Sequence, residues 1–308
     1  MAYAKSADSN RVSLRYVKEV TPGVTPNAAL QEVRMTGESF SGSRTSISSN
    51  EIRADRNISD LVTTAENASG SLEFELSPGS YDDFLAAAVG GVWDNDVLVN
   101  GINEDYFTFE KFFQDINKRE RYFGCAVSTF NLSCQTGSMV TGSFEFMGFG
   151  QEDVTAPVGN GTVNPPTTTP IYNLTTDMTS FKVNGVEYAD GLTNFSLNVN
   201  ANLRSKPVIG SKYSTIGFGS LAITGDWQSY FTNANPVLDI YKNETAVAVE
   251  FTFSKGGKSY KVELPKVKFG SKEHVAGGIN QDVELNMTYQ AILDGTVGGM
   301  IRITRATV

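Results

Sequence analysis

The sequence contains few of the side chains on which enzymes usually depend. Among its 308 residues there are one histidine and two cysteines. His274 lies in the glycine-flanked stretch GSKEHVAGG, which is typical of a solvated loop. No phosphate-binding loop, dinucleotide-binding glycine pattern, nucleophile elbow or HExxH segment is present. The neighbouring Asp82 and Asp83 would point about 100° apart on a helix, so they are a poor carboxylate pair. We therefore expect no enzyme, no metal site and no cofactor.

Long hydrophobic runs are also missing. The longest candidate, FLAAAVGGVW, is far shorter than the roughly 18 apolar residues that a membrane-spanning helix needs. The opening residues MAYAKSADSNRVSLRY lack an apolar leader segment, so we expect no secretory signal. Cys125 and Cys134 are separated by an odd number of positions in a strand-like segment, which places them on opposite sides of it. We expect no contact with membranes, a cytoplasmic site of synthesis, and two buried thiols without a disulfide.

Positive charge is scarce. The formal net charge is −9, and the isoelectric point calculated from the sequence is about 4.8. A protein that grips nucleic acid through its phosphates needs clustered lysines and arginines. The composition therefore argues against tight nucleic-acid binding, but it is compatible with a protein that lies near DNA without holding it.

Alternating apolar and polar residues dominate the sequence, so we predict a mostly β fold. In GSLEFELSP, residues 70–78, Leu72 and Phe74 point to one side while Glu73 and Glu75 point to the other. Antiparallel sheets often bury one face and expose the other, which explains this alternation. It explains less well why the polar faces of several strands lack lysine and arginine.

Two helices and one tight turn are predicted beside these strands. PGSYDDFLAAAV has an apolar stripe for packing on a sheet, with Ser80 as a suitable N-cap and acidic residues in the first turn. WQSYFTNANPVLDIYKN is a poorer helix, interrupted at Pro236. Gly256 and Gly257 fit a two-residue hairpin turn between strands.

The chain repeats itself. Four segments recur in the same order: 39–47 with 194–203, 70–76 with 219–225, 107–111 with 251–255, and 141–149 with 280–291. In this alignment Phe40 matches Phe195, and Glu145 matches Glu284. We therefore expect an internal duplication. The predicted organisation is an N-terminal arm (1–38), a first copy (39–150), an extended linker rich in Pro, Thr and Gly (151–177), a second copy (178–291) and a C-terminal arm (292–308).

Several of these segments together resemble a known family. They are RVSLRYVKEVTPGVTP, NEIRADRNISDLV, GSLEFELSPGSYDDFLAAAV, TGSFEFMG and MIRITRA. The chain resembles the major tail tube protein of long non-contractile-tailed bacteriophages, in a version with two tube domains per chain. The resemblance covers nearly the whole chain and is most specific from residue 50 to residue 89.

The resemblance implies a fold and an assembly. Each tube domain is a β-sandwich-like unit with a flanking helix, and sheets of neighbouring copies join into a hollow barrel. Four barrel strands per copy and three chains per ring give roughly 24 strands, enough for an aqueous channel. A trimer would then imitate a hexamer, and a true hexamer lined by one copy is the alternative. The implied partners are further copies of the chain, the tail terminator, tape-measure and distal tail proteins, and phage DNA in transit, in a virion tail assembled in the host cytoplasm.

Two groups of residues follow as site predictions from the resemblance. One group would line the channel with negative charge: Glu73, Glu75, Glu145, Asp282 and Glu284. The other would connect stacked rings. It comprises the long loop 43–69, with Arg53, Asp55 and Arg56, and its shorter counterpart 201–218, with Arg204 and Lys206.

Two other classes of protein compete with this interpretation. A secreted or surface β-sandwich that binds carbohydrate or a receptor is disfavoured, because no leader segment and no clustered Trp, Tyr and Asp site are visible. A tube component of a tail-derived injection machine, such as a type VI secretion system, would share the sheet geometry. Those tubes are usually built from shorter single-domain chains, so the duplication disfavours this class too.

Overall fold

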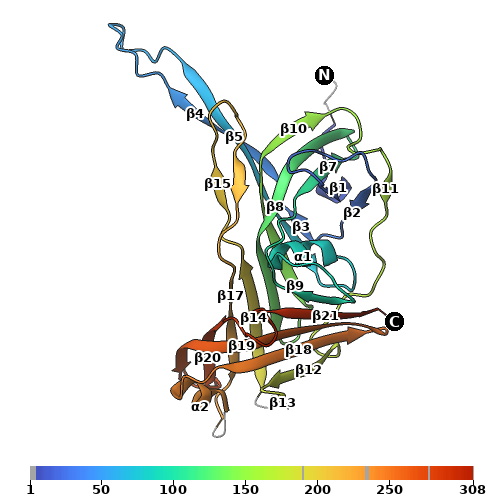
Figure 1. Ribbon diagram of the computed structural model, residues 1–308, viewed down its shortest axis with the longest axis vertical. Helices are drawn as coiled ribbons and strands as arrows, with labels where there is room; N and C mark the ends of the chain where they lie inside the picture. Colours follow the sequence, from blue (N-terminus) through green and yellow to red (C-terminus); the bar gives the residue numbers. More distant parts are fainter. Residues whose placement is uncertain (1–4, 189–190, 233–235, 277, 308) are drawn as a thin grey trace.

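One long β-sheet is the main element of the fold. The computed structural model describes residues 5–188, 191–232, 236–276 and 278–307, and it is mostly β, as the sequence predicts (Figure 1). Across the sheet the strands follow in this order: β4 (Ser41–Ser48) with the short β3 (Gly37–Glu38) before it, β5 (Leu61–Glu75), β9 (Thr141–Gly148), β8 (Lys118–Gln135), β14 (Leu192–Asn200), β17 (Ala222–Tyr230), β20 (Glu284–Ala291) and β19 (Lys258–Val275). All of these neighbours are antiparallel.

A second layer of strands covers one face of this sheet. β8 and β19, each 18 residues long, belong to both layers, because their first parts pair with outer strands and their last parts lie in the long sheet. The outer strands near β8 are β1 (Val12–Lys18), β2 (Leu30–Glu32), β7 (Phe107–Phe113), β10 (Gly150–Val154) and β11 (Val163–Asn164). Those near β19 are β6 (Val97–Val99), β12 (Met178–Val183), β13 (Val186–Glu187), β18 (Val247–Lys255) and β21 (Arg302–Thr307).

The pairing order of the strands is the same in the two halves of the chain. In the first half, β4, β5, β9, β8, β7 and β1 are successive neighbours. In the second half, β14, β17, β20, β19, β18 and β12 follow one another in the same way. One hydrophobic core fills the space between the layers in both halves, and its largest members are aromatic.

The halves are joined by direct pairing of β8 with β14. Seven residue pairs connect the strands, from Gln135 opposite Asn194 to Thr129 opposite Asn200. Leu132 and Leu197 lie opposite each other on the buried side of this junction, and both belong to the shared core. The two halves therefore form one continuous sheet.

Helix α1 (Asp82–Val89) confirms the stronger helix prediction, since residues 84–89 are all buried in the core. The proposed cap is wrong. Tyr81 occupies the N-cap position, and its side chain makes no capping hydrogen bond to the helix. The Ser80 hydroxyl instead pairs with the Ser77 hydroxyl. Helix α2 (Pro236–Lys242) begins at its proline, where the missing N–H costs no hydrogen bond.

Three other local predictions can be compared with the structure. Gly256 and Gly257 both have positive φ and close the β18–β19 hairpin, as predicted. Cys125 and Cys134 are buried free thiols, and burial raises the pKa of Cys134 to about 12. The loop predicted around His274 is wrong, because His274 belongs to β19 and its ring stacks on Phe231 with centroids 4.9 Å apart.

The segments expected as arms and linker are tied into the fold. A short 3-10 helix, η1 (Ser9–Arg11), leads into β1, while β10 and β11 hold parts of the linker against β8 and β2. At the other end, β21 lies between β19 and β6. Every one of these segments thus gains backbone partners in the outer layer.

A charged clasp fixes β21 to the start of α1. The Arg305 guanidinium forms ion pairs with Asp82 and, at 2.8 Å, with Asp96, and it lies 4.4 Å from the ring centroid of Trp93. The Tyr260 hydroxyl also donates to Asp82. Burial, followed by the nearby Asp82 charge, raises the pKa of Tyr260 well above its ordinary value. The clasp connects the second half of the chain to the helix of the first half.

Replacing Arg305 with alanine should destabilise the folded chain by about 2 kcal/mol, because Asp82 loses a charged hydrogen-bond donor in a partly buried site. Urea unfolding of the unassembled protein measures this change. Arg11→Ala is the matched control, since Arg11 is exposed, and it should leave the unfolding midpoint unchanged. Equal midpoints for both variants would contradict a stabilising role for the clasp.

Candidate functional site

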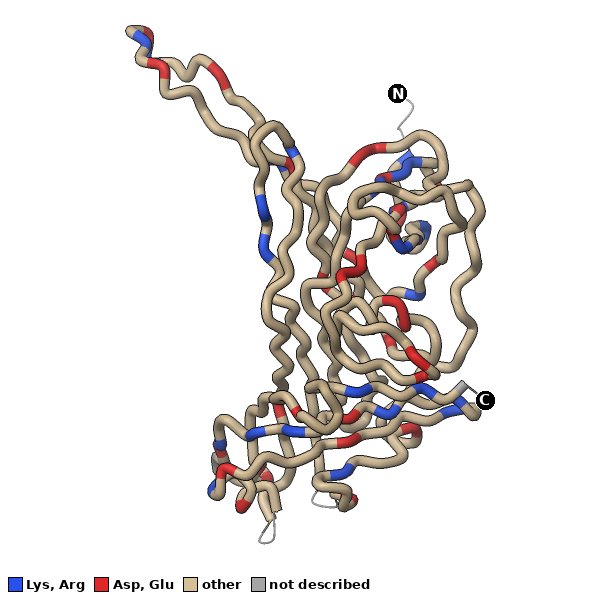
Figure 2. The backbone as a smooth tube through the Cα atoms, viewed as in Figure 1, with Lys and Arg blue, Asp and Glu red and all other residues tan. Residues whose placement is uncertain are grey.

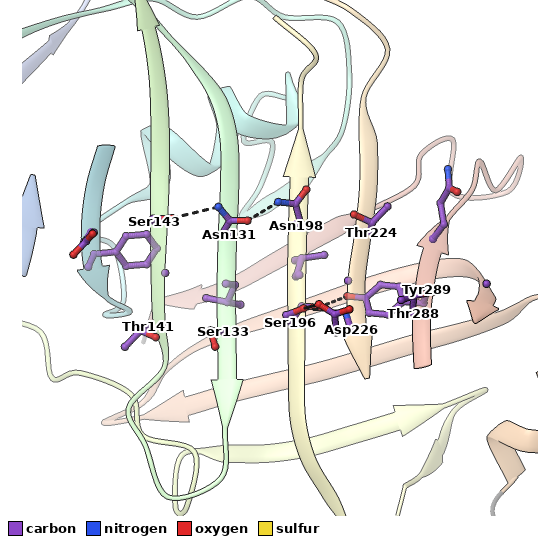
Figure 3. A pocket seen from close by; sticks show the side chains of 18 of the residues that line it. Asn131, Ser133, Thr141, Ser143, Ser196, Asn198, Thr224, Asp226, Thr288 and Tyr289 are labelled. Atoms are coloured by element: carbon purple, nitrogen blue, oxygen red, sulfur yellow. Dashed lines mark hydrogen bonds between the residues drawn. The ribbon is translucent and has the colours of Figure 1, made fainter. Parts of the chain in front are cut away.

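The long sheet has one open face, and this face is polar across both halves. Its side chains form a shallow hollow of about 930 Å³ lined by residues of β5, β9, β8, β14, β17 and β20 (Figure 3). The register places Glu73, Ser143, Asn131, Asn198 and Thr224 in one row across neighbouring strands. In Figure 2 the middle of the upright strands carries little positive charge. The open face is therefore a continuous surface and not a closed pocket.

Hydrogen bonds between side chains connect the two halves on this face. Asn198 donates to the side-chain oxygen of Asn131, and Asn131 donates to the Ser143 hydroxyl at 3.3 Å. On the second half, the Ser196 hydroxyl donates to Asp226 at 3.1 Å, as Figure 3 shows. Of these bonds, the one between Asn198 and Asn131 crosses the β8–β14 junction, and it joins two neutral side chains.

Four of the five predicted channel residues lie on the open face. The register places Glu73 opposite Ser143 and Glu75 opposite Thr141. Glu145 lies opposite Thr129, and Glu284 lies opposite Tyr230. Residues that lie opposite each other in antiparallel strands point to the same face. Each of these four carboxylates therefore lies on the same face as the residue opposite it.

The structure corrects the predicted set of acidic residues on the open face at three positions. Asp282 is exposed in the loop before β20, because the strand begins only at Glu284. Asp226 and Glu273 belong to the open face, opposite Thr288 and Asn286 respectively. Asp226 was missed because the stretch after it was interpreted as a helix, although its alternating burial continues to Tyr230.

β19 differs from the other strands because it carries a basic residue on the open face. Lys268 lies opposite Gln290, which shares the open face with Thr224. Lys268 is exposed and lies on the strand at the edge of the long sheet. Within the described residues the acidic side chains on this face still outnumber it, so the open face remains negative.

The predicted long loop 43–69 is mostly a β-hairpin. β4 and β5 pair from Ser41 opposite Ser69 to Ser48 opposite Leu61, so only residues 49–60 form the loop. This hairpin projects from the body of the molecule (Figure 1), and every residue of β4 is exposed. Its sequence was misread because its alternation is almost entirely polar, with no buried face to mark a strand.

The tip of this hairpin, residues 49–60, contains the three contact residues predicted for the long loop. Arg53 forms a two-pronged hydrogen bond with Asp55, at 3.0 and 2.7 Å. This interaction, together with hydrogen bonds from Asn57, lowers the pKa of Asp55 to about 2. Arg56 has a positive φ of 60° and has no ion pair among the described residues. The tip therefore presents one internally paired arginine and one arginine that is open to a partner.

A second hairpin lies beside the first. It contains β15 (Arg204–Lys206) and β16 (Thr215–Gly217), and both Arg204 and Lys206 are exposed on β15. Farther along it, Lys212 forms an ion pair with Glu66 of β5 at 3.0 Å. Thus the two predicted loop groups lie on adjacent hairpins, but Arg204 and Lys206 are not part of the tip that contains Arg53.

The described residues contain no group of three or more His, Cys, Asp or Glu side chains arranged to hold a metal ion. No helix in the described part of the chain is long and apolar enough to cross a membrane. The fold and its surfaces define a mostly β protein with one extended polar sheet face and two projecting hairpins.

Comparison with known proteins identifies the family. A family model described as phage tail tube protein matches residues 9–291. Because the match covers most of the 308 residues, the chain belongs to this family and is a structural component of a phage tail. No curated protein matches the sequence.

Gly225 allows close packing beneath the open face. It lies opposite Tyr289, whose hydroxyl donates to the Ser196 carbonyl at 2.6 Å. A β-carbon at Gly225 would lie 2.5 Å from the Tyr289 hydroxyl oxygen and closer still to the Ser196 carbonyl oxygen. The glycine therefore leaves room for a hydrogen bond that connects β20 with β14 across β17.

Gly225→Ala should lower the unfolding free energy by about 2 kcal/mol, because the backbone must shift to accept the methyl group. Gly295→Ala is the control, since a β-carbon there meets nothing within 4 Å and φ is not positive. Urea unfolding of both variants measures the difference. A Gly225 variant as stable as the Gly295 variant would show that the sheet can relax without cost.

Proposed function

We propose that this chain assembles with copies of itself into stacked rings that form the phage tail tube. The observation that carries the proposal is the pairing of β8 with β14, which makes one eight-stranded sheet from two four-stranded parts. A sheet that already joins two similar units can be extended by the same kind of pairing between chains. Full closure into a barrel would then remove the exposed sheet edges.

A ring of three chains agrees best with this sheet. We interpret the two halves as two tube domains, so that three chains contribute roughly 24 strands, enough to enclose an aqueous channel. A hexamer lined by only one domain of each chain would require the continuous open face to be divided between the lumen and the outside. The trimer therefore explains why both halves present polar residues on the same face.

In this proposal the open face lines the channel through which phage DNA passes. Negative charge on this face comes from Glu73, Glu75, Glu145, Asp226, Glu273 and Glu284. Apart from Lys268, the rest of the face is mostly neutral and polar. Basic walls would hold DNA through counterion release. Carboxylates repel it over a screening distance of about 8 Å, so the duplex moves along the wall without binding to it.

The remaining partners follow from the same role. A tube of this kind is assembled in the host cytoplasm around a tape-measure protein and ends at terminator and distal tail proteins. The hairpin tip at residues 49–60 reaches the next ring in the stack. Its ion pairs are individually weak when exposed, but they are repeated around every ring.

Replacing Glu73 and Glu75 with lysine should make assembled tails retain DNA, because the channel wall gains phosphate-binding groups. The measurement is the fraction of DNA released from assembled virions after triggering. Asp239→Lys with Glu244→Lys is the control. It makes the same change in charge at α2 and the turn after it, on the buried side of the sheet. Unchanged release in the Glu73 and Glu75 variant would contradict the channel assignment.

Arg53→Glu with Arg56→Glu should shorten or abolish tubes, because the tip loses both arginines. Tube length in electron micrographs measures the effect. A swap control, Arg53→Glu with Asp55→Arg, keeps the internal pair of the tip but reverses its direction. If Arg53 only shapes the tip, the swap should form tubes of ordinary length. Ordinary tubes from the Arg53 and Arg56 variant would leave the tip as a surface loop without a docking role.

A further inference from the structure

Two β-bulges recur in the long strands β8 and β19. In β8, Phe123 and Gly124 face the single residue Thr108, and Ser128 is an extra residue four positions later. In β19, Pro265 and Lys266 face Ala248, and Gly270 is the extra residue. Both bulges in β19 lie 142 positions after their counterparts in β8. Bulges mark fixed points in a strand, so they align the two halves residue by residue.

The paired registers carry this alignment across the sheet. In this alignment Ser133 is equivalent to Val275. The strand pairing then makes Thr141 equivalent to Glu284, and Glu75 equivalent to Tyr230. At the far edge, the segment from Ser39 to Ser43 corresponds to the segment from Ser196 to Asn200. The second of these segments is the part of β14 that pairs with β8 inside the chain.

The edges that correspond to this internal junction have no second strand partner among the described residues. Within the described residues, β3 and β4 pair only with β5. Beyond Val267, β19 pairs only with β20, because β18 ends its pairing there and β21 ends earlier. The chain thus contains one β8–β14 junction and, at its two outer edges, the segments that correspond to β14 and β8.

We propose that residues 39–43 of one chain pair with residues 271–275 of the next chain, in the register of the β8–β14 junction. The pairing is antiparallel and places Ser41 opposite Glu273 and Phe40 opposite His274. This inference rests on the proposed ring assembly and specifies which strands meet. The partner is a second copy of this chain.

The side chains at these edges suit the proposed register. On the open face, the Ser41 hydroxyl can donate to the Glu273 carboxylate, where the internal junction has Asn198 beside Asn131. On the core face, Phe40 lies opposite the His274 ring, where the internal junction has Leu197 opposite Leu132.

The Phe40 amide is also placed for this pairing. In the single chain, the Phe40 amide donates to the Glu38 carboxylate at 3.0 Å. Its neighbour Ser39 donates to the Ser71 carbonyl of β5, so the Phe40 amide points to the free edge. In the ring, a carbonyl of the next chain replaces the Glu38 carboxylate as its partner.

Disulfide cross-linking tests the register directly. The variant Ser41→Cys with Glu273→Cys is assembled, oxidised and separated on a denaturing gel without reductant. Opposed residues in antiparallel strands have Cα atoms about 4.5–5.5 Å apart, within the range for a disulfide. Six strands separate the two positions within one chain, so any bond joins different chains. The control is Ser41→Cys with Ser271→Cys, which is one diagonal step out of register.

For the variant with Glu273→Cys, the expected result is a ladder of cross-linked chains that ends at the number of chains in one ring. The control variant with Ser271→Cys should give at most a tenth as much cross-linked protein. Tubes that form normally but cross-link equally at both positions, or at neither, would overturn the register while leaving the tube function intact. If the unmodified chain forms no rings or tubes at all, the proposed function and this inference fail together.

Hydrogen exchange provides a second measurement on the unmodified chain. The amides of residues 39–43 and 271–275 that point to the free edges should exchange about tenfold or more slowly after assembly, because they gain backbone acceptors. Residues 129–135 and 194–200 serve as the internal reference, since they are already paired in the single chain. Unchanged exchange at the two edges in assembled tubes would contradict the inference.

Discussion

The pairing of β8 with β14 is the contact on which the rest of the structure depends. It joins two sheets of four strands into one and brings both halves onto a shared core, with Leu132 opposite Leu197 on the buried side. Without it the polar rows of the two halves would be separate patches. With it they form one open face, and within the described residues each outer edge lacks a second strand partner, which favours pairing with another chain.

The two faces of the long sheet have different roles because side chains alternate between them along each strand. The buried face is dense with aromatic side chains, and the clasp of Arg305 with Asp82 holds the C-terminal strand to the first helix. The open face carries carboxylates and neutral polar groups whose hydrogen bonds stay on the surface. Stability is therefore supplied by one layer and the proposed channel wall by the other, so the wall can be acidic without charge entering the core.

The sequence alone predicted the β class, helix α1 and the family. Four of the five carboxylates predicted from it lie on the open face, because alternation fixes which side of a strand a residue faces. Residue-level alignment of the halves was less accurate. The bulges place Phe40 on Leu197, two positions from the sequence match with Phe195. An alignment of the two halves that is wrong by an even number of residues still keeps every side chain on its own face, so the alternation of the sequence cannot reveal the error. Asp226 was missed because the stretch after it was interpreted as a helix, and the β4–β5 hairpin was missed because its pattern is almost entirely polar.

End-on class averages of the purified protein in negative-stain electron microscopy test the central claim most directly. The claim is that the long sheet closes with those of two other chains around a channel. It predicts hollow rings with three-fold symmetry and a finer six-fold modulation from the two halves of each chain. Rings with exact six-fold symmetry and six chains, or particles that remain single chains without a central hole under tube-forming conditions, would contradict it.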